Sequence, residues 1–369
     1  MKRLIMNWCS MLLLLSAGCL AGSCSMITDD LDDCPDGLYV TFKYDYNLQR
    51  TDLFANQVGE VTLYVFDADG KLVTTREEGA APAVARFAAP SSTIHITDLA
   101  PGKYRLVALA GQRPYADMAG TGRAAFIRPD MQPGSDISSL GVRLEGEMQS
   151  DGLYHITKNG LPLDTLWHGM TDGTVEVYDD YSNRASYVTV SLVRDTKKIK
   201  VSLRELDDPT AMDIADYDIR ITDANSHLRW DNTPDMAVRA VYTPYETWNS
   251  YDMLPSEGEG DDGLELVSYI ANAGFMTSRL VLHGGDGMSD GRLQVYEKQT
   301  GNTVADMNLP ALLSRLRVRA EGSGYSEQEF LDRACDYEVE VWLRGGRPEY
   351  VDLGISDFGW SVRINYDEL

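Results

Sequence analysis

Histidine and cysteine, the residues that most often bind zinc or act as nucleophiles, are scarce in this chain. There are five of each among 369 residues, and none stands in an H-x-x-x-H, H-E-x-x-H or C-x-x-C arrangement. No zinc site is predicted, because such sites need several ligands at a set spacing. We therefore assign no catalytic residue, no metal ligand and no cofactor-binding residue, and we expect a protein that is not an enzyme.

Positive charge is also in short supply. Lys and Arg number 33 against 57 Asp and Glu, which gives a formal net charge of −24. A surface this acidic repels phosphate backbones and anionic lipid headgroups, so we expect no nucleic-acid partner. A pair of close carboxylates, as in a glycosidase, can exist among so many acids, but no spacing singles one out. We expect no small-molecule substrate.

An uninterrupted apolar run of about 20 residues, as a membrane-spanning helix requires, is missing. Residues 4–20 are largely apolar but contain Asn7, Ser10 and Ser16. Two basic residues precede this segment and small residues follow it, which is the order of a secretory signal peptide. We predict a signal peptide over residues 1–23.

Two cysteines directly follow small residues: SAG precedes Cys19 and AGS precedes Cys24. This arrangement is typical of bacterial lipoproteins, in which the cysteine takes a diacylglycerol and becomes the new N-terminus. We predict lipidation at Cys24, with Cys19 as the less favoured position; an ordinary signal peptide is the alternative. Two or more acyl chains hold a protein stably on a bilayer. Residues 24–36, which are rich in aspartate, would then form a solvated tether.

Cleavage before Cys24 would leave two further cysteines in the mature chain, Cys34 and Cys335. In an exported protein they could form a disulfide that ties the start of the first domain to the second. Two unpaired thiols are the favoured alternative, because the sequence does not place the two Cα atoms within bridging distance.

Short strand-like segments punctuated by Gly, Pro, Asn and Asp dominate the rest of the chain. EVTLYVFD (60–67) runs into Asp69-Gly70 and is followed by KLVTTR, which predicts a β-hairpin. Pro101-Gly102 predicts a type II turn before a buried strand. Helical signals are confined to residues 51–57 and 326–338, where Ser326 is a candidate N-cap.

These patterns predict an all-β fold, and the length suits two domains. We place the boundary near Asp195, in a charged turn (194–198) between two strand patterns. The predicted domains are an N-terminal β-sandwich over residues 37–195 and a C-terminal β-sandwich over residues 196–369.

Aromatic residues offer an alternative function. Side chains that could stack on sugar rings are Trp167, Trp230, Trp248, Tyr242 and Tyr245. In β-sandwiches such residues more often pack in the core or at edges, so a surface glycan-binding lipoprotein is kept as the second hypothesis.

Several segments together resemble the FimB-type fimbrial anchor lipoproteins of type V, fimbrillin-type pili. They are the lipobox-like cysteine, the acidic tether, FKYDYN (42–47), VTLYVFDADGKLV (61–73), LAPGKYRLVALAG (99–111) and FGWSVRINYDEL (358–369). The resemblance implies two tandem transthyretin-like (immunoglobulin-like) β-sandwich domains. It also implies a pilus anchor in the cell outer membrane, exposed at the surface, which holds the base of the fimbrium for cell adhesion and helps to set its length.

Subunits of such pili join by strand complementation, in which an extended segment completes a neighbour's sheet. The expected partners are thus a fimbrial shaft subunit and the outer membrane, the latter through the N-terminal acyl chains. Because the chain ends directly after a strand-like segment, we expect this protein to receive a strand at a groove or sheet edge. The residues do not identify that edge.

Overall fold

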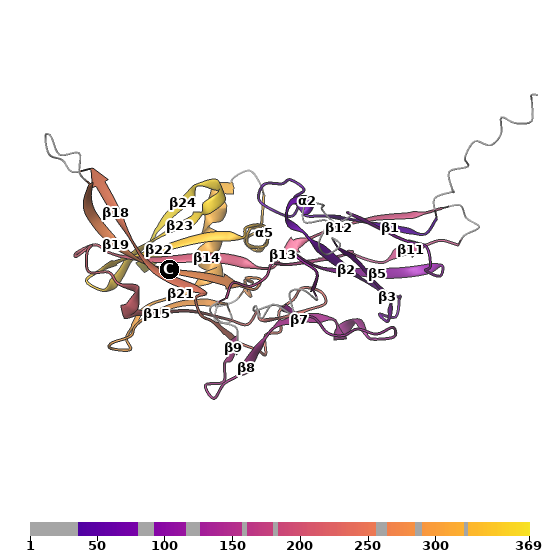
Figure 1. The fold of residues 1–369 in the computed structure, drawn as a ribbon, viewed down its shortest axis with the longest axis horizontal. Coiled ribbons are helices and arrows are strands. Elements are labelled where there is room, and N and C mark those ends of the chain that lie inside the picture. Colours follow the sequence, from indigo (N-terminus) through magenta and orange to yellow (C-terminus); the bar gives the residue numbers. More distant parts are fainter. Residues whose placement is uncertain are drawn as a thin grey trace, which may run out of the picture.

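The computed structural model describes residues 36–79, 92–115, 126–156, 161–179, 184–255, 264–284, 290–320 and 324–369. Within these ranges strands predominate, and the prediction of an all-β fold is confirmed. Figure 1 shows an elongated molecule with the first strands of the chain at one end and the last strands at the other.

The first part of the molecule is a sandwich of two sheets. Sheet A has the order β12 (Ser186–Ser191), β1 (Leu38–Lys43), β4 (Thr93–Ile96). Sheet B has the order β13 (Val193–Arg194), β10 (Leu166–Met170), β5 (Gly102–Gly111), β2 (Glu60–Phe66), β3 (Leu72–Gly79), and β11 (Val175–Val177) also pairs with β5. Apolar side chains of the two sheets, among them Val40, Phe42, Leu63, Leu106 and Trp167, form one core between them.

The hairpin predicted at Asp69-Gly70 is confirmed: β2 and β3 pair antiparallel, and Gly70 has φ +74°. The type II turn predicted at Pro101-Gly102 is wrong, because Gly102 does not have the positive φ that such a turn requires. Gly102 instead begins β5, where it pairs with Val177 of β11. Pairing along the strand therefore fixes an extended conformation at this glycine.

The second part contains two larger sheets. Sheet C has the order β18 (Glu246–Pro255), β19 (Leu264–Thr277), β14 (Lys197–Glu205), β22 (Asp336–Arg344), β23 (Arg347–Ile355), β24 (Trp360–Asn365). Sheet D has the order β21 (Thr303–Asn308), β20 (Arg292–Glu297), β15 (Tyr217–Asp223), β17 (Ala240–Tyr242), β9 (Tyr154–Ile156), β8 (Gly146–Met148). A small third sheet has the order β16 (His227–Arg229), β7 (Gly141–Leu144), β6 (Phe126–Ile127).

Helices are short throughout the described ranges. The predicted helical segments hold α2 (Phe54–Gln57) and α5 (Glu327–Arg333), and the Ser326 hydroxyl accepts the backbone N–H of Glu329 at 3.1 Å as its N-cap. The sequence patterns did not indicate α4 (Leu309–Ser314). The short 3-10 turns are η1 (Ile137–Ser139), η3 (Ile214–Asp216), η4 (Arg315–Ala320), η5 (Ser356–Phe358) and η6 (Tyr366–Glu368).

One segment of the first half of the chain, residues 126–156, pairs with strands of the second half. β7 pairs antiparallel with β16, and β9 pairs parallel with β17. Because of these pairings, a single boundary in the sequence does not separate the two sandwiches completely. We infer a division at Asp195, which lies between β13 and β14, with residues 126–156 contributing to both sandwiches.

Sheet B is buried on both faces, and this explains why every residue of β2 is buried. Val61, Leu63 and Val65 belong to the core beneath sheet A, whereas Tyr64 and Phe66 join a core that continues into the second sandwich. Strands covered on both sides lose the alternation of apolar and polar residues. The apolar core of the second sandwich therefore continues onto one face of sheet B, and we call it the shared core.

Candidate functional site

The predicted lipidation and tether residues lie outside the described ranges, which begin at Asp36. Lipidation at Cys24, or at Cys19, therefore stays a prediction, as does the signal peptide. Among the described residues no helix is long and apolar enough to cross a membrane. The same residues contain no group of three or more His, Cys, Asp or Glu side chains placed to hold a metal ion.

Cys335 is buried, and its Sγ lies 3.8 Å from the Tyr44 hydroxyl and 3.9 Å from Lys197 Nζ. Tyr44 directly follows the C-terminal end of β1, whereas Cys34 precedes the N-terminal end. A strand of six residues spans roughly 20 Å. Cys34 lies outside the described residues, so the bridge between Cys34 and Cys335 stays a prediction.

Residues 287–291, GMSDG, match the G-x-S-x-G spacing of a nucleophilic serine. That motif functions at a turn from a strand into a helix. Here β20 begins at Arg292, immediately after the motif, so no helix follows it. Ser289 itself lies outside the described ranges, and we assign it no role.

The aromatic residues proposed for sugar binding do not form one site. Trp167 and Tyr242 are core residues, with 0% and 2% of their surfaces exposed, so neither can stack on a sugar. Trp230, Tyr245 and Trp248 are partly buried and reach the surface on different elements. The Arg105 guanidinium covers the ring of Trp230 at 5.3 Å.

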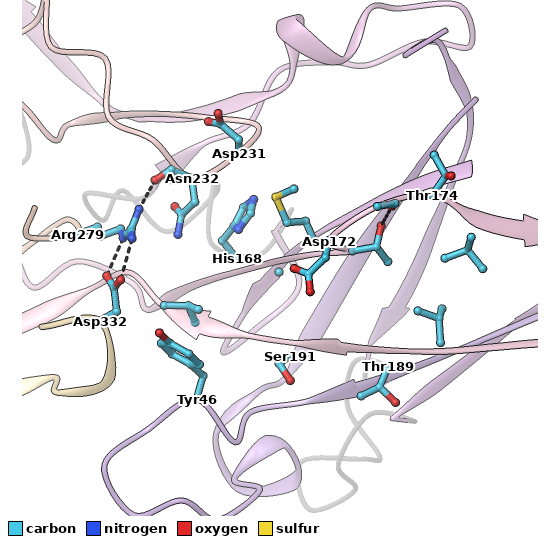
Figure 2. A pocket seen from close by; sticks show the side chains of 17 residues that line it. Tyr46, His168, Asp172, Thr174, Thr189, Ser191, Asp231, Asn232, Arg279 and Asp332 are labelled. Atoms are coloured by element: carbon cyan, nitrogen blue, oxygen red, sulfur yellow. Dashed lines mark hydrogen bonds and ion pairs between the residues drawn. The ribbon is translucent and has the colours of Figure 1, made fainter. Parts of the chain in front are cut away.

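A cavity of about 640 Å³ lies where the two sandwiches meet, and we call it the seam pocket. The first sandwich contributes β10, the loop 171–174 and β12, and the second contributes residues 231–232, Arg279 and Asp332. Figure 2 shows Thr189 and Ser191 of β12 on one side of the space, with the Asp172 carboxylate facing them. The pocket thus follows the gap between the edges of sheets A and B and ends at the second sandwich.

The edge of β12 that borders the seam pocket has free hydrogen-bonding directions. β12 is the last strand of sheet A, and β1 is its only strand partner in the described part of the chain. The N–H groups of Ser186 and Leu192 donate to carbonyl groups at the two ends of β1, at 2.9 and 2.7 Å. Because successive residues of a strand point their N–H and C=O groups to opposite sides, Tyr187, Thr189 and Ser191 direct theirs away from β1.

The outer face of sheet A carries a row of stacked rings that ends at this edge. Tyr39 of β1 lies between His95 of β4, with ring centroids 3.9 Å apart, and Tyr187 of β12, with centroids 5.0 Å apart. Tyr187 is 68% exposed. One face of its ring is stacked, and the other lies on the side of the open edge.

The inner end of the pocket is held by a buried ion pair. Arg279 donates to both carboxylate oxygens of Asp332, at 2.7 and 2.8 Å, and to the backbone carbonyl of Asn232 at 2.6 Å. Beneath this end, Asn232 Nδ2 donates to Asp195 Oδ1 at 2.8 Å. Burial and hydrogen bonding make this end rigid, because breaking a buried pair leaves a charge without compensation.

Burial sets the ionisation of the groups around the pocket. It raises the pKa of Asp195 to about 7 and lowers the pKa of His168 to about 4. His168 is therefore neutral at pH 7, and its Nε2 lies 2.8 Å from the carbonyl oxygen of Trp230. Although partial burial opposes it, hydrogen bonds from Thr233 lower the pKa of Asp231. Asp231 is consequently an anion at the pocket wall.

Sequence patterns gave no signal for these pocket residues. His168, Asp195, Asn232, Arg279 and Asp332 are spread over 165 positions and follow no common spacing. The sequence places Asp195 in a charged turn, yet Asp195, Thr196 and Lys197 are fully buried in the structure. Asn232 has a positive φ of 63°, which asparagine tolerates better than most residues, so its residue type fits its backbone conformation.

Comparison with known proteins gives this geometry a family context. The family model described as fimbrillin-A associated anchor proteins Mfa1 and Mfa2 matches residues 31–366. The chain belongs to this anchor family. The resemblance noted from the sequence is thereby confirmed. Membership identifies a structural family of fimbrial anchors and not a family of enzymes.

Individual relatives of this anchor-family chain are distant. The minor fimbrium anchoring subunit Mfa2 of Porphyromonas gingivalis is 24% identical over 233 residues, or 62% of this chain and 63% of that protein. The alignment thus spans less than two thirds of the curated relative. Its solved structure has a TM-score of 0.56 at 18% identity, covering 90% of this chain and all of the other, and shows a shared fold.

A second solved structure, from Bacteroides thetaiotaomicron, is described as a putative polysaccharide binding protein. It is 26% identical, with a TM-score of 0.65, and the match covers 90% of this chain and 99% of the other. The anchor-family fold therefore also occurs in a protein to which glycan binding has been attributed.

Proposed function

We propose that this protein anchors the base of a fimbria in the outer membrane and helps to regulate its assembly and length. The observation that carries the proposal is the open edge of β12, which borders a pocket large enough to admit an extended segment. An incoming strand would pair with the outward N–H and C=O groups of Tyr187, Thr189 and Ser191. A shaft subunit bound in this way would be held by main-chain hydrogen bonds.

The surroundings of the edge favour a strand over a compact ligand. Exposed strand edges are normally blocked by charge, proline, bulges or a covering segment. β12 is six residues long and contains neither proline nor a charged residue. The carbonyl of Ser191 lies close to Gly169 of β10, so Tyr187 and Thr189 form the most open stretch of the edge. The free ring face of Tyr187 would also stack against an aromatic or aliphatic side chain of the incoming strand.

In this proposal, the protein is attached to the membrane through the lipid on Cys24. Residues 24–36 would connect the lipid to β1, which lies toward the end of the molecule away from the second sandwich (Figure 1). The first sandwich would then lie closer to the membrane than the second. A fimbrial anchor needs both attachments, one to lipid and one to the shaft.

Strand acceptance is tested by Thr189→Pro. Proline lacks the outward N–H but leaves the bonds from β12 to β1 in place, since proline is tolerated at strand edges whose N–H faces away from the sheet. Thr189→Val is the matched control, because it changes the side chain and keeps the N–H. We expect Thr189→Pro cells to release fibres into the medium while the protein stays membrane-bound with an unchanged melting temperature, and Thr189→Val cells to behave like wild type.

The size of the effect follows from one lost bond and one unsatisfied partner group. That amounts to about 1–3 kcal/mol, or roughly 5- to 100-fold in affinity. Fibres retained equally by both variants would contradict strand acceptance at β12.

Lipid attachment is tested by palmitate labelling of wild type, Cys24→Ala and Cys19→Ala. We expect label to disappear only in Cys24→Ala, together with shedding of fibres that still carry the anchor protein. Label lost only in Cys19→Ala would move the lipid to that residue. Label retained in both variants would show that neither cysteine is the sole acceptor.

Glycan binding is the second candidate function, favoured by the likeness to the Bacteroides thetaiotaomicron protein described above. The aromatic side chains still available for it are those that reach the surface, Trp230, Tyr245 and Trp248. A glycan array probed with wild type and with Trp248→Ala and Trp230→Ala tests it. Binding that either substitution removes would support this function, and an array without signal would contradict it.

A further inference from the structure

The seam pocket has acceptors in excess at its inner end. The Oδ1 atom of Asn232 has no hydrogen-bond partner among the described residues, and only 7% of this residue is exposed. Figure 2 shows the Asn232 amide pointing into the space between Arg279 and His168. A buried acceptor without a partner costs roughly 1–3 kcal/mol, so a donor supplied by a ligand would be favoured at this point.

Negative charge accompanies this acceptor. Asp172 and Asp231 line the pocket on either side of His168, and neither has an Arg or Lys ion-pair partner among the described residues. Arg279, the cation on the pocket wall, is already occupied by both oxygens of Asp332. His168 supplies no positive charge, because it is neutral at pH 7. The inner end of the pocket could therefore accept hydrogen bonds from one more cationic group.

We propose that the seam pocket selects an extended partner segment carrying a Lys or Arg side chain. The cationic group would lie between Asp172 and Asp231 and would donate to Asn232 Oδ1, while the backbone of the segment pairs with β12. This inference rests on the proposed strand acceptance and adds to it a rule for choosing the partner. Complementary charge gives register and specificity more than raw affinity. A strand with an acidic residue at this position would meet two carboxylates.

The test uses the purified full chain in detergent and three fluorescein-labelled ten-residue peptides of alternating Val and Thr. One central position is Lys, norleucine or Glu, so that the peptides share length and strand propensity and differ in charge. Fluorescence anisotropy at low and high salt gives the affinities. We expect the Lys peptide to bind at least tenfold more tightly than the norleucine peptide, the Glu peptide to bind most weakly, and high salt to reduce the difference.

The variants separate charge selection from strand pairing. Asp172→Asn with Asp231→Asn should reduce the Lys advantage to less than threefold and leave norleucine binding unchanged. The matched control, Asp69→Asn with Asp367→Asn, removes the same net charge at exposed positions away from the pocket and should keep the Lys advantage. Thr189→Pro should weaken all three peptides alike.

Each pattern of results has a defined meaning. Equal binding of the Lys, norleucine and Glu peptides, removed by Thr189→Pro, would overturn the charge rule and leave strand acceptance standing. A Lys advantage that survives Asp172→Asn with Asp231→Asn would also overturn the rule. Binding by none of the peptides, or binding unaffected by Thr189→Pro, would overturn strand acceptance at β12 and the charge rule with it.

Discussion

The edge strand β12 of the first sandwich differs from two edge strands of the second, β24 and β21, in how it is covered. In the second, the outer strand β24 is covered: Arg319 of η4 donates to the carbonyl of Ser361 at 2.8 Å. Strand β21 in the same sandwich is met by Tyr366, whose hydroxyl accepts the N–H of Asp306 at 3.2 Å. In the first sandwich, β12 has no such cover in the described part of the chain. Edges of this fold can therefore be covered by other segments, and the open edge of β12 is for this reason a candidate binding surface.

The two sandwiches also differ in how far their apolar cores extend. The core of the first sandwich is enclosed between sheets A and B, whereas the core of the second extends across the seam onto the far face of sheet B. An open edge and a shared core stand close together. Val190 of β12 belongs to the core of the first sandwich, which keeps the strand in position while its outer edge stays available.

The largest expected effect is on the core of the first sandwich. Trp167→Ala removes a fully buried side chain from the first sandwich and should lower the free energy of unfolding by about 3–5 kcal/mol. If the sandwiches unfold as one unit, urea denaturation followed by circular dichroism will show one transition at a lower midpoint. Two separate transitions in the variant, the second with the wild-type midpoint, would show that the core does not couple the two sandwiches.

A pH-dependent effect of similar or smaller size is expected at the seam. The pKa of Asp195 is about 7 in the folded protein and about 3.9 in an unfolded chain. Between these values the folded state holds a proton that the unfolded state has lost. The stabilisation is therefore fully present below about pH 4 and is lost as the pH rises to about 7, by up to about 4 kcal/mol.

Asp195→Asn lacks this proton linkage but can still accept the bond from Asn232. The difference in unfolding free energy between wild type and variant, measured by urea titration from pH 4 to 7.5, should fall with rising pH. Taking the difference removes the contributions of other groups, such as Asp223, whose pKa is also raised to about 7 by burial, and His168, whose lowered pKa acts in the opposite sense. A difference that stays constant over this range would contradict the assignment.

The smallest effect is expected in the second sandwich, at the start of α5. Ser326→Ala removes the N-cap bond to Glu329 and should cost about 1 kcal/mol. Ser326→Asp restores an acceptor and should recover most of the loss in a thermal melt. Fibre retention should stay at the wild-type level in both variants, since Ser326 does not line the seam pocket, whereas Asp332 near the other end of α5 does. Loss of fibres in Ser326→Ala would show that the second sandwich also takes part in holding the shaft.

Local patterns predicted the elements that depend on local chemistry. Asp69-Gly70 favours the conformation of a hairpin turn, and Ser326 with Glu329 marks a helix start, so both were found from the sequence. The strand exchange of residues 126–156 was not, because β9 and β17 have only three residues each and pair through contacts distant in sequence.

The candidate site was predicted least well. Only the sheet-edge nature of the partner surface was expected, without its location. The seam pocket is assembled from residues that range from Tyr46 to Asp332, and burial at the interface, which no local pattern encodes, gives Asp195 and His168 their properties. Lipidation at Cys24, by contrast, is a purely local prediction and needs no fold at all.

The parallel pairing of β1 with β12 has a mechanical consequence. A membrane tether would pull β1 from Leu38 along its own axis, and a shaft held at β12 would pull in the opposite direction. The six residue pairs between these strands would then bear tension together, in shear, instead of separating one after another as in a zipper. Such a joint fails by its unfolding rate under force and not by its equilibrium stability. Drag on a fibre would thus be resisted by the whole ladder at once.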